Sequence, residues 1–272
     1  MKGGTLLQTK KIKFDNISKV FETRRQTTVA VKDFMMEMQA GEFISIIGPS
    51  GCGKSTLIRM LDGIIKPTSG SIYIDGVKVS NKKKMPSETL KKMGFIFQQA
   101  NLLPWYTVRQ NVALPLKIFG LKGEKWEKRV DQLIDMVGLT KYANAYPIEI
   151  SGGMAQRAGV IRAMVHDPEI LLMDEPFGSL DEMTREQLDL ELLDIWKQTQ
   201  KTIIFITHSV EEAILLSSRV YVMGTNPGRL VSVVDIDLPR PRGLNLITNP
   251  KFIEYEANLT NLIGEIDLSK IK

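Results

Sequence analysis

The chain has 272 residues, of which 43% are hydrophobic and 25% are charged, values close to those of ordinary globular proteins. This composition excludes collagen-like, disordered and coiled-coil chains, and no uncharged apolar run reaches the roughly 18 residues that a membrane-spanning helix requires. The net charge is +5, and the basic residues are scattered apart from the run Lys82–Lys84. We interpret them as a solvated surface, with a surface for nucleic acid or lipid headgroups as the alternative.

The cysteine content and the N-terminus favour a protein that is not exported. The only cysteine is Cys52, so no internal disulfide can form, as is usual in a reducing compartment. The segment Met1–Lys13 lacks an apolar core of signal-peptide length. We therefore expect the chain to remain inside the cell.

Short apolar runs rich in β-branched residues alternate with helical patterns along the chain. Several runs are apolar at every position rather than at alternate positions, which is typical of parallel strands buried on both faces of a sheet. We predict strands over residues 43–47, 72–74, 94–97, 170–173, 203–207, 220–223 and 230–234. Apolar residues three or four positions apart predict amphipathic helices over residues 126–137 and 188–199. The pattern indicates an α/β fold.

The stretch from about residue 100 to 158 interrupts this alternation. It contains helical patterns and prolines but no convincing strand, so we interpret it as a helical insertion in one α/β domain spanning residues 1–235. Residues 236–272 are predicted to form a short C-terminal extension. Within it we expect an extended linker over 238–243 and a helix over about 250–263.

A phosphate-binding loop follows the first of these predicted strands. The loop fits the pattern Gly-x-x-x-x-Gly-Lys-Ser/Thr, and a helical pattern begins at its end. Its backbone N–H groups can turn towards phosphate oxygens, and the helix N-terminus favours an anion. Lys54 would reach the β- and γ-phosphates of ATP, and the Ser55 hydroxyl would bind Mg²⁺. Cys52 is interpreted as a small residue shielded by the nucleotide, with a reactive thiol as the alternative. The predicted ATP-binding residues of the loop are Gly48, Pro49, Ser50, Gly51, Cys52, Gly53, Lys54, Ser55 and Thr56.

A later strand ends in two acidic residues. The run over 170–173 is followed directly by Asp174 and Glu175. Acids at the exit of a buried parallel strand lie beside the nucleotide of a phosphate-loop fold, so we predict that Asp174 helps to hold Mg²⁺. Glu175 faces the other side of the strand and is predicted to be the catalytic base that polarises the attacking water.

A third segment, residues 150–157, reads Ile-Ser-Gly-Gly-Met-Ala-Gln-Arg and opens a probable helix. A serine-capped helix N-terminus suits an anion. The segment resembles the LSGGQ signature of ATP-binding-cassette (ABC) proteins, with isoleucine in place of leucine and methionine where the family often has glutamine. Further ABC elements follow in the family's order, so the resemblance covers about residues 12–235. The signature residues predicted from it are Ser151, Gly152, Gly153 and Gln156.

The resemblance implies a P-loop NTPase core with a mostly parallel sheet, an N-terminal antiparallel β portion and an inserted α-helical subdomain. Gln98 resembles the Q-loop glutamine and would contact both ATP and Mg²⁺, and His208 resembles the catalytic switch histidine. Asp181 resembles the D-loop aspartate. Phe21 resembles the aromatic residue that stacks on adenine, with Phe14 as an alternative. The predicted metal ligands are Ser55, Gln98 and Asp174.

The resemblance also implies how two phosphate-binding segments of one chain cooperate. In the family, each ATP lies between the phosphate loop of one subunit and the signature of the other. Ser151 would then contact the γ-phosphate in trans in a head-to-tail dimer, most simply a homodimer. The alternative is a glycine-rich helix cap inside one domain.

The resemblance further implies that ATP hydrolysis drives transport. The expected partners are a second ATPase subunit, two integral membrane permease subunits and, indirectly, a solute-binding protein, with no nucleic acid. Several segments, among them Leu-Pro-Arg-Pro-Arg over 238–242, resemble importer ATPases for nitrate, sulfonates and taurine. The expected location is peripheral, at the cytoplasmic face of the membrane. The alternatives are an ABC exporter or lipid-extraction ATPase and a non-transport ABC ATPase. No role is predicted for the second histidine, His166.

Overall fold

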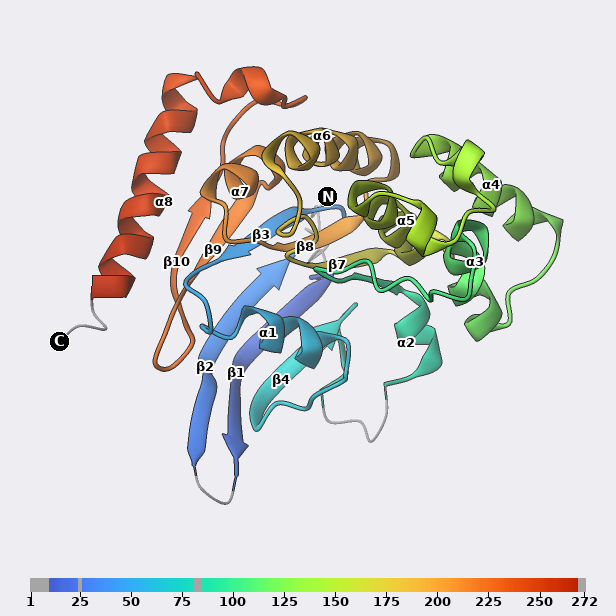
Figure 1. The fold of residues 1–272 in the computed structure, drawn as a ribbon. Helices are drawn as coiled ribbons and strands as arrows, with labels where there is room; N and C mark the ends of the chain where they lie inside the picture. The colour runs from blue at the N-terminus through green and yellow to red at the C-terminus, as the bar shows by residue number, and fades with distance from the viewer. Residues whose placement is uncertain (1–9, 24–25, 81–84, 269–272) are drawn as a thin grey trace, which may run out of the picture.

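The computed structural model describes residues 10–23, 26–80 and 85–268, so the basic run Lys82–Lys84 and the first nine residues lie outside the described part. Two β-sheets and eight α-helices make up the described fold. Helices α5, α6 and α7 lie over one face of the larger sheet, whereas α1 and the smaller sheet lie against the other face (Figure 1).

The larger sheet has six strands in the order β10-β9-β3-β8-β7-β6. All neighbouring pairs are parallel except β10 with β9. The strands are β3 (Phe43–Ile47), β6 (Met93–Ile96), β7 (Ile170–Asp174), β8 (Thr202–Ile206), β9 (Arg219–Gly224) and β10 (Arg229–Asp235). Each matches a predicted strand to within one residue at either end.

The continuous apolar runs of this sheet are explained by burial on both faces. In β8, Ile203 and Phe205 pack in the core beneath α6 and α7, whereas Ile204 and Ile206 pack in the core shared with α1 and the smaller sheet. Successive side chains of a strand point to opposite faces, so a strand between two cores needs apolar residues at every position.

The smaller sheet is antiparallel, with the order β2-β1-β4-β5, and confirms the antiparallel β portion implied by the resemblance. Its strands are β1 (Ile12–Glu22), β2 (Thr27–Met38), β4 (Ser69–Ile74) and β5 (Val77–Lys78). No individual strand was predicted before residue 43. The pairing of β1 with β2 shifts register three times between Phe14 and Val20, which removes a clean alternation from the sequence.

The helices agree with the predicted periodicity. They are α1 (Lys54–Leu61), α2 (Ser87–Lys91), α3 (Val108–Phe119), α4 (Glu124–Met136), α5 (Gly152–Met164), α6 (Glu182–Thr199), α7 (Val210–Leu216) and α8 (Pro250–Leu268), with 3-10 turns η1 (Thr140–Tyr142), η2 (Pro147–Glu149) and η3 (Leu244–Leu246). The predicted helix over 188–199 begins six residues earlier, at Glu182, because the preceding Asp181 caps it. No described helix is long and apolar enough to cross a membrane.

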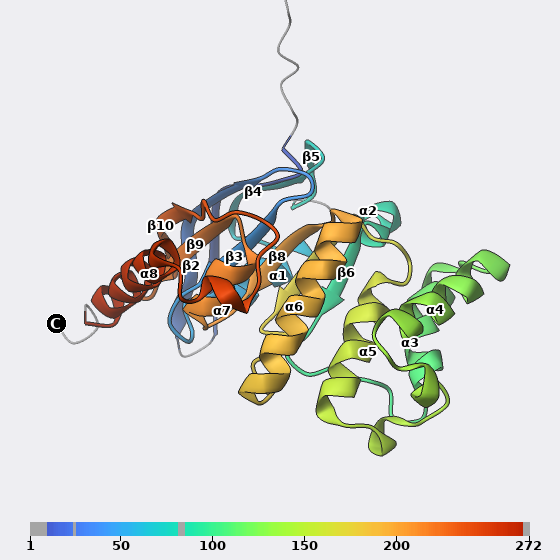
Figure 2. The same ribbon diagram turned by 90° about the horizontal axis from the view of Figure 1, so that it is seen from above.

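The insertion predicted over about 100–158 contains helices and no strand. Helices α3 and α4 pack on α5 around a hydrophobic core of their own, which includes Val112, Leu133 and Ile161. Seen from above, they project from the β6 side of the sheet, opposite α8 (Figure 2). His166 lies in the turn after α5, with its ring against Phe119, and is buried.

The C-terminal segment is packed against the sheet. Residues 236–243, which include the linker predicted over 238–243, form neither helix nor strand, but Ile236, Leu238 and Arg242 are buried. The Arg242 guanidinium donates to the carbonyls of Ile214 and Ser217, both at 2.7 Å, and so caps the end of α7. Helix α8 extends to Leu268 and joins the core beneath α7, which makes the segment part of the fold, while the domain boundary near residue 235 stays a prediction.

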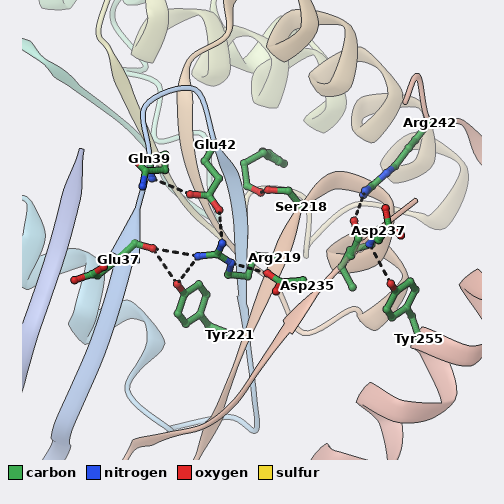
Figure 3. A network of polar contacts seen from close by, with 12 residues as sticks. Glu37, Gln39, Glu42, Ser218, Arg219, Tyr221, Asp235, Asp237, Arg242 and Tyr255 are labelled. Carbon is green, nitrogen blue, oxygen red and sulfur yellow. Dashed lines mark hydrogen bonds and ion pairs between the residues drawn. The ribbon is translucent and has the colours of Figure 1, made fainter. Parts of the chain in front are cut away.

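Polar contacts join the two sheets, and others join parts of the C-terminal segment to one another, as between Asp237 and Tyr255 (Figure 3). Arg219 at the start of β9 forms ion pairs with Asp235 at 2.8 Å and Glu42 at 3.6 Å. The Tyr221 hydroxyl donates to the Glu37 carbonyl of β2 at 3.0 Å. The Tyr221 contact joins β9 of the larger sheet to β2 of the antiparallel sheet.

Candidate active site

The phosphate loop connects the carboxyl end of β3 to the N-terminus of α1. Two of its glycines are required by close contacts. A Cβ atom at Gly48 would collide with the Met223 carbonyl, and one at Gly53, where φ is +97°, would lie 2.7 Å from the Ala30 carbonyl oxygen. The loop can therefore follow this path only with glycine at these positions. No side chain caps α1, which leaves its first N–H groups for a ligand.

A pocket of about 250 Å³ opens over this loop. Its lining residues are Ala30, Ser50, Gly51, Cys52, Gly53, Lys54, Ser55, Thr56 and Glu175. The Lys54 side chain is only 6% exposed, and its Nζ donates to the carbonyls of Gly48 at 2.7 Å and Pro49 at 3.3 Å. Within the described residues, no carboxylate forms an ion pair with Lys54. A buried ammonium held only by carbonyls is well suited to an anionic ligand.

A larger, more open hollow of about 640 Å³ lies between the β1–β2 hairpin and Pro227. None of the predicted site residues lines it. We therefore assign the chemistry to the smaller pocket, where the loop, a buried cation and two carboxylates come together.

Asp174 and Ser55, both predicted to hold Mg²⁺, lie in contact beside the loop. The Ser55 hydroxyl donates to Oδ1 of Asp174 at 2.9 Å. Burial raises the pKa of Asp174, and the neighbouring Glu175 carboxylate raises it further. A bound divalent cation would relieve this destabilisation of the charged carboxylate. Hydroxyl and carboxylate oxygens are the ligands that Mg²⁺ prefers, so the residues present fit this ion.

Glu175 has a constrained backbone. It is a non-glycine residue with φ at +48°, in the left-handed region, and its N–H donates to the Ile206 carbonyl at 3.0 Å. Such a conformation costs of order 1–3 kcal/mol and persists where the surrounding structure enforces it. The side chain is partly exposed and lines the pocket.

His208 and Gln98 lie next to Glu175. Nδ1 of His208 is 3.5 Å from Oε2 of Glu175. A Cβ atom at Gly178 would lie 3.5 Å from Cε1 of His208 and 3.6 Å from Nε2 of Gln98. Three predicted site residues from three separate strand ends therefore converge at one place, around Gly178.

The signature segment is presented at the surface. Ser151 caps α5 by accepting the N–H of Met154 at 3.3 Å, and both Ser151 and Gly152 are exposed. A Cβ atom at Gly153 would lie 3.0 Å from Cγ2 of Thr184, so α5 begins close against the start of α6. None of the pocket's lining residues among those described comes from 150–157.

Gln156 differs from its prediction as a signature contact. Its side chain is 3% exposed, and Nε2 donates to the Phe97 carbonyl at 3.1 Å. Gln156 sits one turn into α5, on the face turned towards the core, and ties that helix to the segment that carries Gln98. Its burial does not support contact with a partner's phosphate.

Of the remaining predicted residues, Asp181 and Phe21 lie at exposed positions. Asp181 caps α6 by accepting the N–H of Thr184 at 3.0 Å. Hydrogen bonding to the Thr184 side chain, and then to its backbone N–H, lowers the pKa of Asp181. Phe21, near the end of β1, is 38% exposed, with the Lys19 ammonium 4.9 Å from its ring centre. Phe14 is buried edge-on against Phe34, which removes it as the alternative adenine-stacking residue. Cys52 is already buried beneath the loop.

Two contributions to the site were not predicted. Ala30 of β2 lines the pocket and sets the close approach that requires Gly53. Ala30 belongs to no sequence motif, and its strand lacks a regular alternation, so nothing in the sequence marked it as a residue of the site. Gly178, two residues beyond Pro176, lies at ordinary contact distance from Gln98 and His208, so no steric requirement for glycine could have identified it.

Comparisons with known proteins agree with this geometry. The family model described as ABC transporter matches residues 31–178. An aliphatic sulfonates import ATP-binding protein of Bacillus cereus is 42% identical over 231 residues, 85% of this chain and 88% of that protein. A nitrate import ATP-binding protein of Synechocystis is 38% identical over 258 residues, 93% of this chain and 94% of that protein.

Solved structures give the same result. A dimeric ATP-binding cassette in a post-hydrolysis state, bound to ADP and inorganic phosphate, superposes with a TM-score of 0.74 at 32% identity. The match covers 84% of this chain and all of that one. The sequence elements, the fold and these similarities together show that the chain belongs to the ABC transporter ATP-binding family and is an ATPase of that family.

Proposed function

We propose that the chain is the ATP-hydrolysing subunit of an ABC importer for a small anionic solute of the sulfonate or nitrate class. The observation that carries the importer assignment is the similarity, at about 40% identity, to sulfonate and nitrate import ATP-binding proteins, which in the nitrate case extends over 93% of the chain. The solute itself does not contact this subunit in such an arrangement, so the solute class rests on the relatives alone.

ATP binding uses the pocket above the phosphate loop. The N–H groups of the loop and the N-terminus of α1 bind the phosphate oxygens, and Lys54 turns its ammonium from the loop carbonyls to the phosphates. Phe21 stacks on the adenine ring. Ser55, Asp174 and Gln98 would hold Mg²⁺, which neutralises phosphate charge when bound.

Hydrolysis uses the groups at the strand ends. Glu175 accepts a proton from a water molecule as the water oxygen attacks the γ-phosphorus and the bond to the β-phosphate oxygen breaks. The products are ADP and inorganic phosphate. His208 hydrogen-bonds the γ-phosphate and orients it towards that water, consistent with its position 3.5 Å from Glu175.

Completion of the site requires a second copy of the chain. Ser151 and Gly152 lie exposed at the N-terminus of α5 and contribute nothing to the pocket of their own chain. In a head-to-tail dimer they contact the γ-phosphate bound by the partner, and Asp181 lies at the same interface. ATP thus closes the dimer and its hydrolysis reopens it.

The proposed membrane partners are two permease subunits, and a solute-binding protein acts through them. The permeases dock near Gln98 at the cytoplasmic face of the membrane, where Trp105 is 67% exposed and offers an aromatic anchor. The chain itself is then a peripheral subunit.

Transport can be tested with the chain and its cognate permease subunits in sealed proteoliposomes that contain ATP and Mg²⁺. Addition of the solute-binding protein should stimulate ATP hydrolysis and cause uptake of a radiolabelled alkanesulfonate or nitrate. Vesicles with the Glu175→Gln variant provide the control for leakage. ATP-dependent release of solute, or turnover that the binding protein leaves unchanged, would contradict the importer assignment.

A further inference from the structure

The loop that carries His208 is held by a buried hydrogen-bond network. We call residues Thr207–Ser209 the switch loop. Thr207 is 2% exposed, and its hydroxyl donates to Oε2 of Glu212. The Thr207 hydroxyl oxygen also accepts the N–H of Ser209 at 2.9 Å. The Ser209 hydroxyl accepts the N–H of Glu212 at 3.2 Å. The residues on both sides of His208 are thus tied to one glutamate in the first turn of α7.

The same glutamate faces α6, which lies beside α7 on one face of the central sheet (Figures 1 and 2). Oε1 of Glu212 is 3.9 Å from Nε of Arg185. The Arg185 guanidinium also donates to the Leu180 carbonyl at 3.0 Å. Because Leu180 directly precedes Asp181, the network connects the switch loop with the segment that carries the D-loop aspartate.

Glu212, and not the neighbouring Asp189, is the charged partner of Arg185 in this cluster. Asp189, one turn further along α6, is 3% exposed, and its Oδ1 has no hydrogen-bond partner among the described residues. Burial, reinforced by the Glu212 carboxylate, raises the pKa of Asp189 to about 9. Asp189 therefore carries a proton at neutral pH. Glu182, Glu186 and Glu211 also border the cluster, at more exposed positions.

We propose that Glu212 is a positioning residue for His208, which holds the switch loop through Thr207 and links it through Arg185 to the segment Leu180–Asp181. Glu212 is only 7% exposed, and burying a carboxylate costs free energy that an apolar residue of similar size would avoid. A role in orienting His208 accounts for a carboxylate here. The inference rests on the proposed role of His208, and it adds the contacts that hold the switch loop in place.

Variants of Thr207 test the link, because they change one hydroxyl and little volume. Thr207→Val removes the donor to Glu212, whereas Thr207→Ser keeps it. We expect Thr207→Val to lower kcat for ATP by about 10- to 100-fold, since small misplacements of a catalytic group have effects of this size. The KM for ATP should change less than about threefold, and Thr207→Ser should restore most of kcat. Glu212→Gln should lower kcat in the same direction, and Glu211→Gln, at an exposed neighbouring position, is the matched control.

A double variant separates positioning from general stability. If Glu212 and Thr207 act through His208, the His208→Ala/Thr207→Val variant should be no slower than His208→Ala alone. Additive losses, or a kcat of Thr207→Val equal to that of the unchanged chain, would overturn the inference while leaving the role of His208 intact. An unchanged kcat in His208→Ala would instead contradict the proposed function. Thermal unfolding of every variant shows whether a loss of kcat merely follows a loss of folded protein.

Discussion

The chain presents two helix N-termini that suit an anion, and they are built differently. Helix α1 begins behind Gly53, has no side-chain cap and opens into a pocket of about 250 Å³ that contains the buried Lys54. Helix α5 begins behind Ser151, whose hydroxyl accepts a backbone N–H of its own first turn, and lies at the surface. Both starts offer free N–H groups and a favourable helix dipole.

The difference between them is one of completeness. Around α1, one chain supplies the loop, the cation and the two carboxylates at the end of β7. Around α5, one chain supplies only the exposed serine and glycines, packed against the start of α6. The N-terminus of α1 therefore belongs to a nearly complete binding site. The N-terminus of α5 can bind a phosphate only when another surface brings that phosphate to it. Each of the following variants tests one side of this contrast.

The largest effect is expected on the α1 side, from Glu175→Gln. The amide keeps the size of the side chain but cannot accept the proton of the attacking water, so kcat should fall by about 10²- to 10⁴-fold. The affinity for ATP should stay within a few-fold of the original. Steady-state turnover and ATP titration measure the two quantities, with Glu211→Gln as the control. Turnover within tenfold of the original would exclude Glu175 as the base.

The next effect is expected on the α5 side, from Ser151→Arg. A large cation at the exposed helix N-terminus should block closure of the dimer and lower turnover by about 100-fold, while ATP binding by the single chain is unchanged. Ser151→Ala is the comparison for the added bulk and charge, because it removes only the hydroxyl, both as the helix cap, worth about 1 kcal/mol, and as the proposed phosphate contact. Unchanged turnover in Ser151→Arg would make α5 an ordinary structural helix.

Lys54→Ala should weaken ATP binding itself. The ammonium is buried beside the loop, and a charge-assisted hydrogen bond contributes about 1.5–3 kcal/mol, so the affinity should fall by roughly 10- to 100-fold. Lys66→Ala, at an exposed position beyond α1, provides the control. Calorimetric titration of each variant with ATP gives the comparison. Equal affinities for the two variants would show that the pocket does not bind phosphate.

The last effect concerns stability rather than turnover or ATP binding, and it involves Asp189, which packs near Glu212 and the switch loop. The pKa of Asp189 is about 9 in the folded chain and near 3.8 when unfolded, so the folded state binds the extra proton and loses stability as pH rises between these values. Asp189→Asn cannot lose that proton. The free energy of unfolding of Asp189→Asn minus that of the original chain should therefore increase as the pH rises, by up to about 1.4 kcal/mol per pH unit in this range. Urea unfolding at pH 6 and pH 8 measures the difference, and a pH-independent difference would contradict it.

The sequence predicted best what depends on local pattern. The strands of the parallel sheet are buried on both faces, so their apolar runs are continuous and easily recognised. The phosphate loop and the acids after β7 have fixed spacings that follow from phosphate and metal chemistry. Strands β1 and β2 were not identified, because register shifts between Phe14 and Val20 break the alternation on which such predictions depend.

Features that depend on tertiary contacts could not be predicted from the sequence. Gln156 lies in the signature, yet the rotation of α5 turns it towards the Phe97 carbonyl. The segment 238–243 is predicted to be an extended linker, but Arg242 holds it against the end of α7. Glu212 was not singled out, because its role depends on Thr207 and Arg185, which only the fold brings together.

The central claim is that each ATP is held by the phosphate loop of one chain and the signature of another. It is tested most directly by mixing two defective variants, Lys54→Ala and Ser151→Arg, each carried on the Glu175→Gln background so that bound ATP is not consumed. Size-exclusion chromatography with light scattering then reports ATP-dependent dimers. Neither variant alone should dimerise at ATP concentrations that saturate the Glu175→Gln parent, whereas their mixture should form heterodimers with one bound ATP, because one intact composite site remains. Dimerisation of the Ser151→Arg variant alone to the same extent as its parent, or no dimer in the mixture, would contradict the claim.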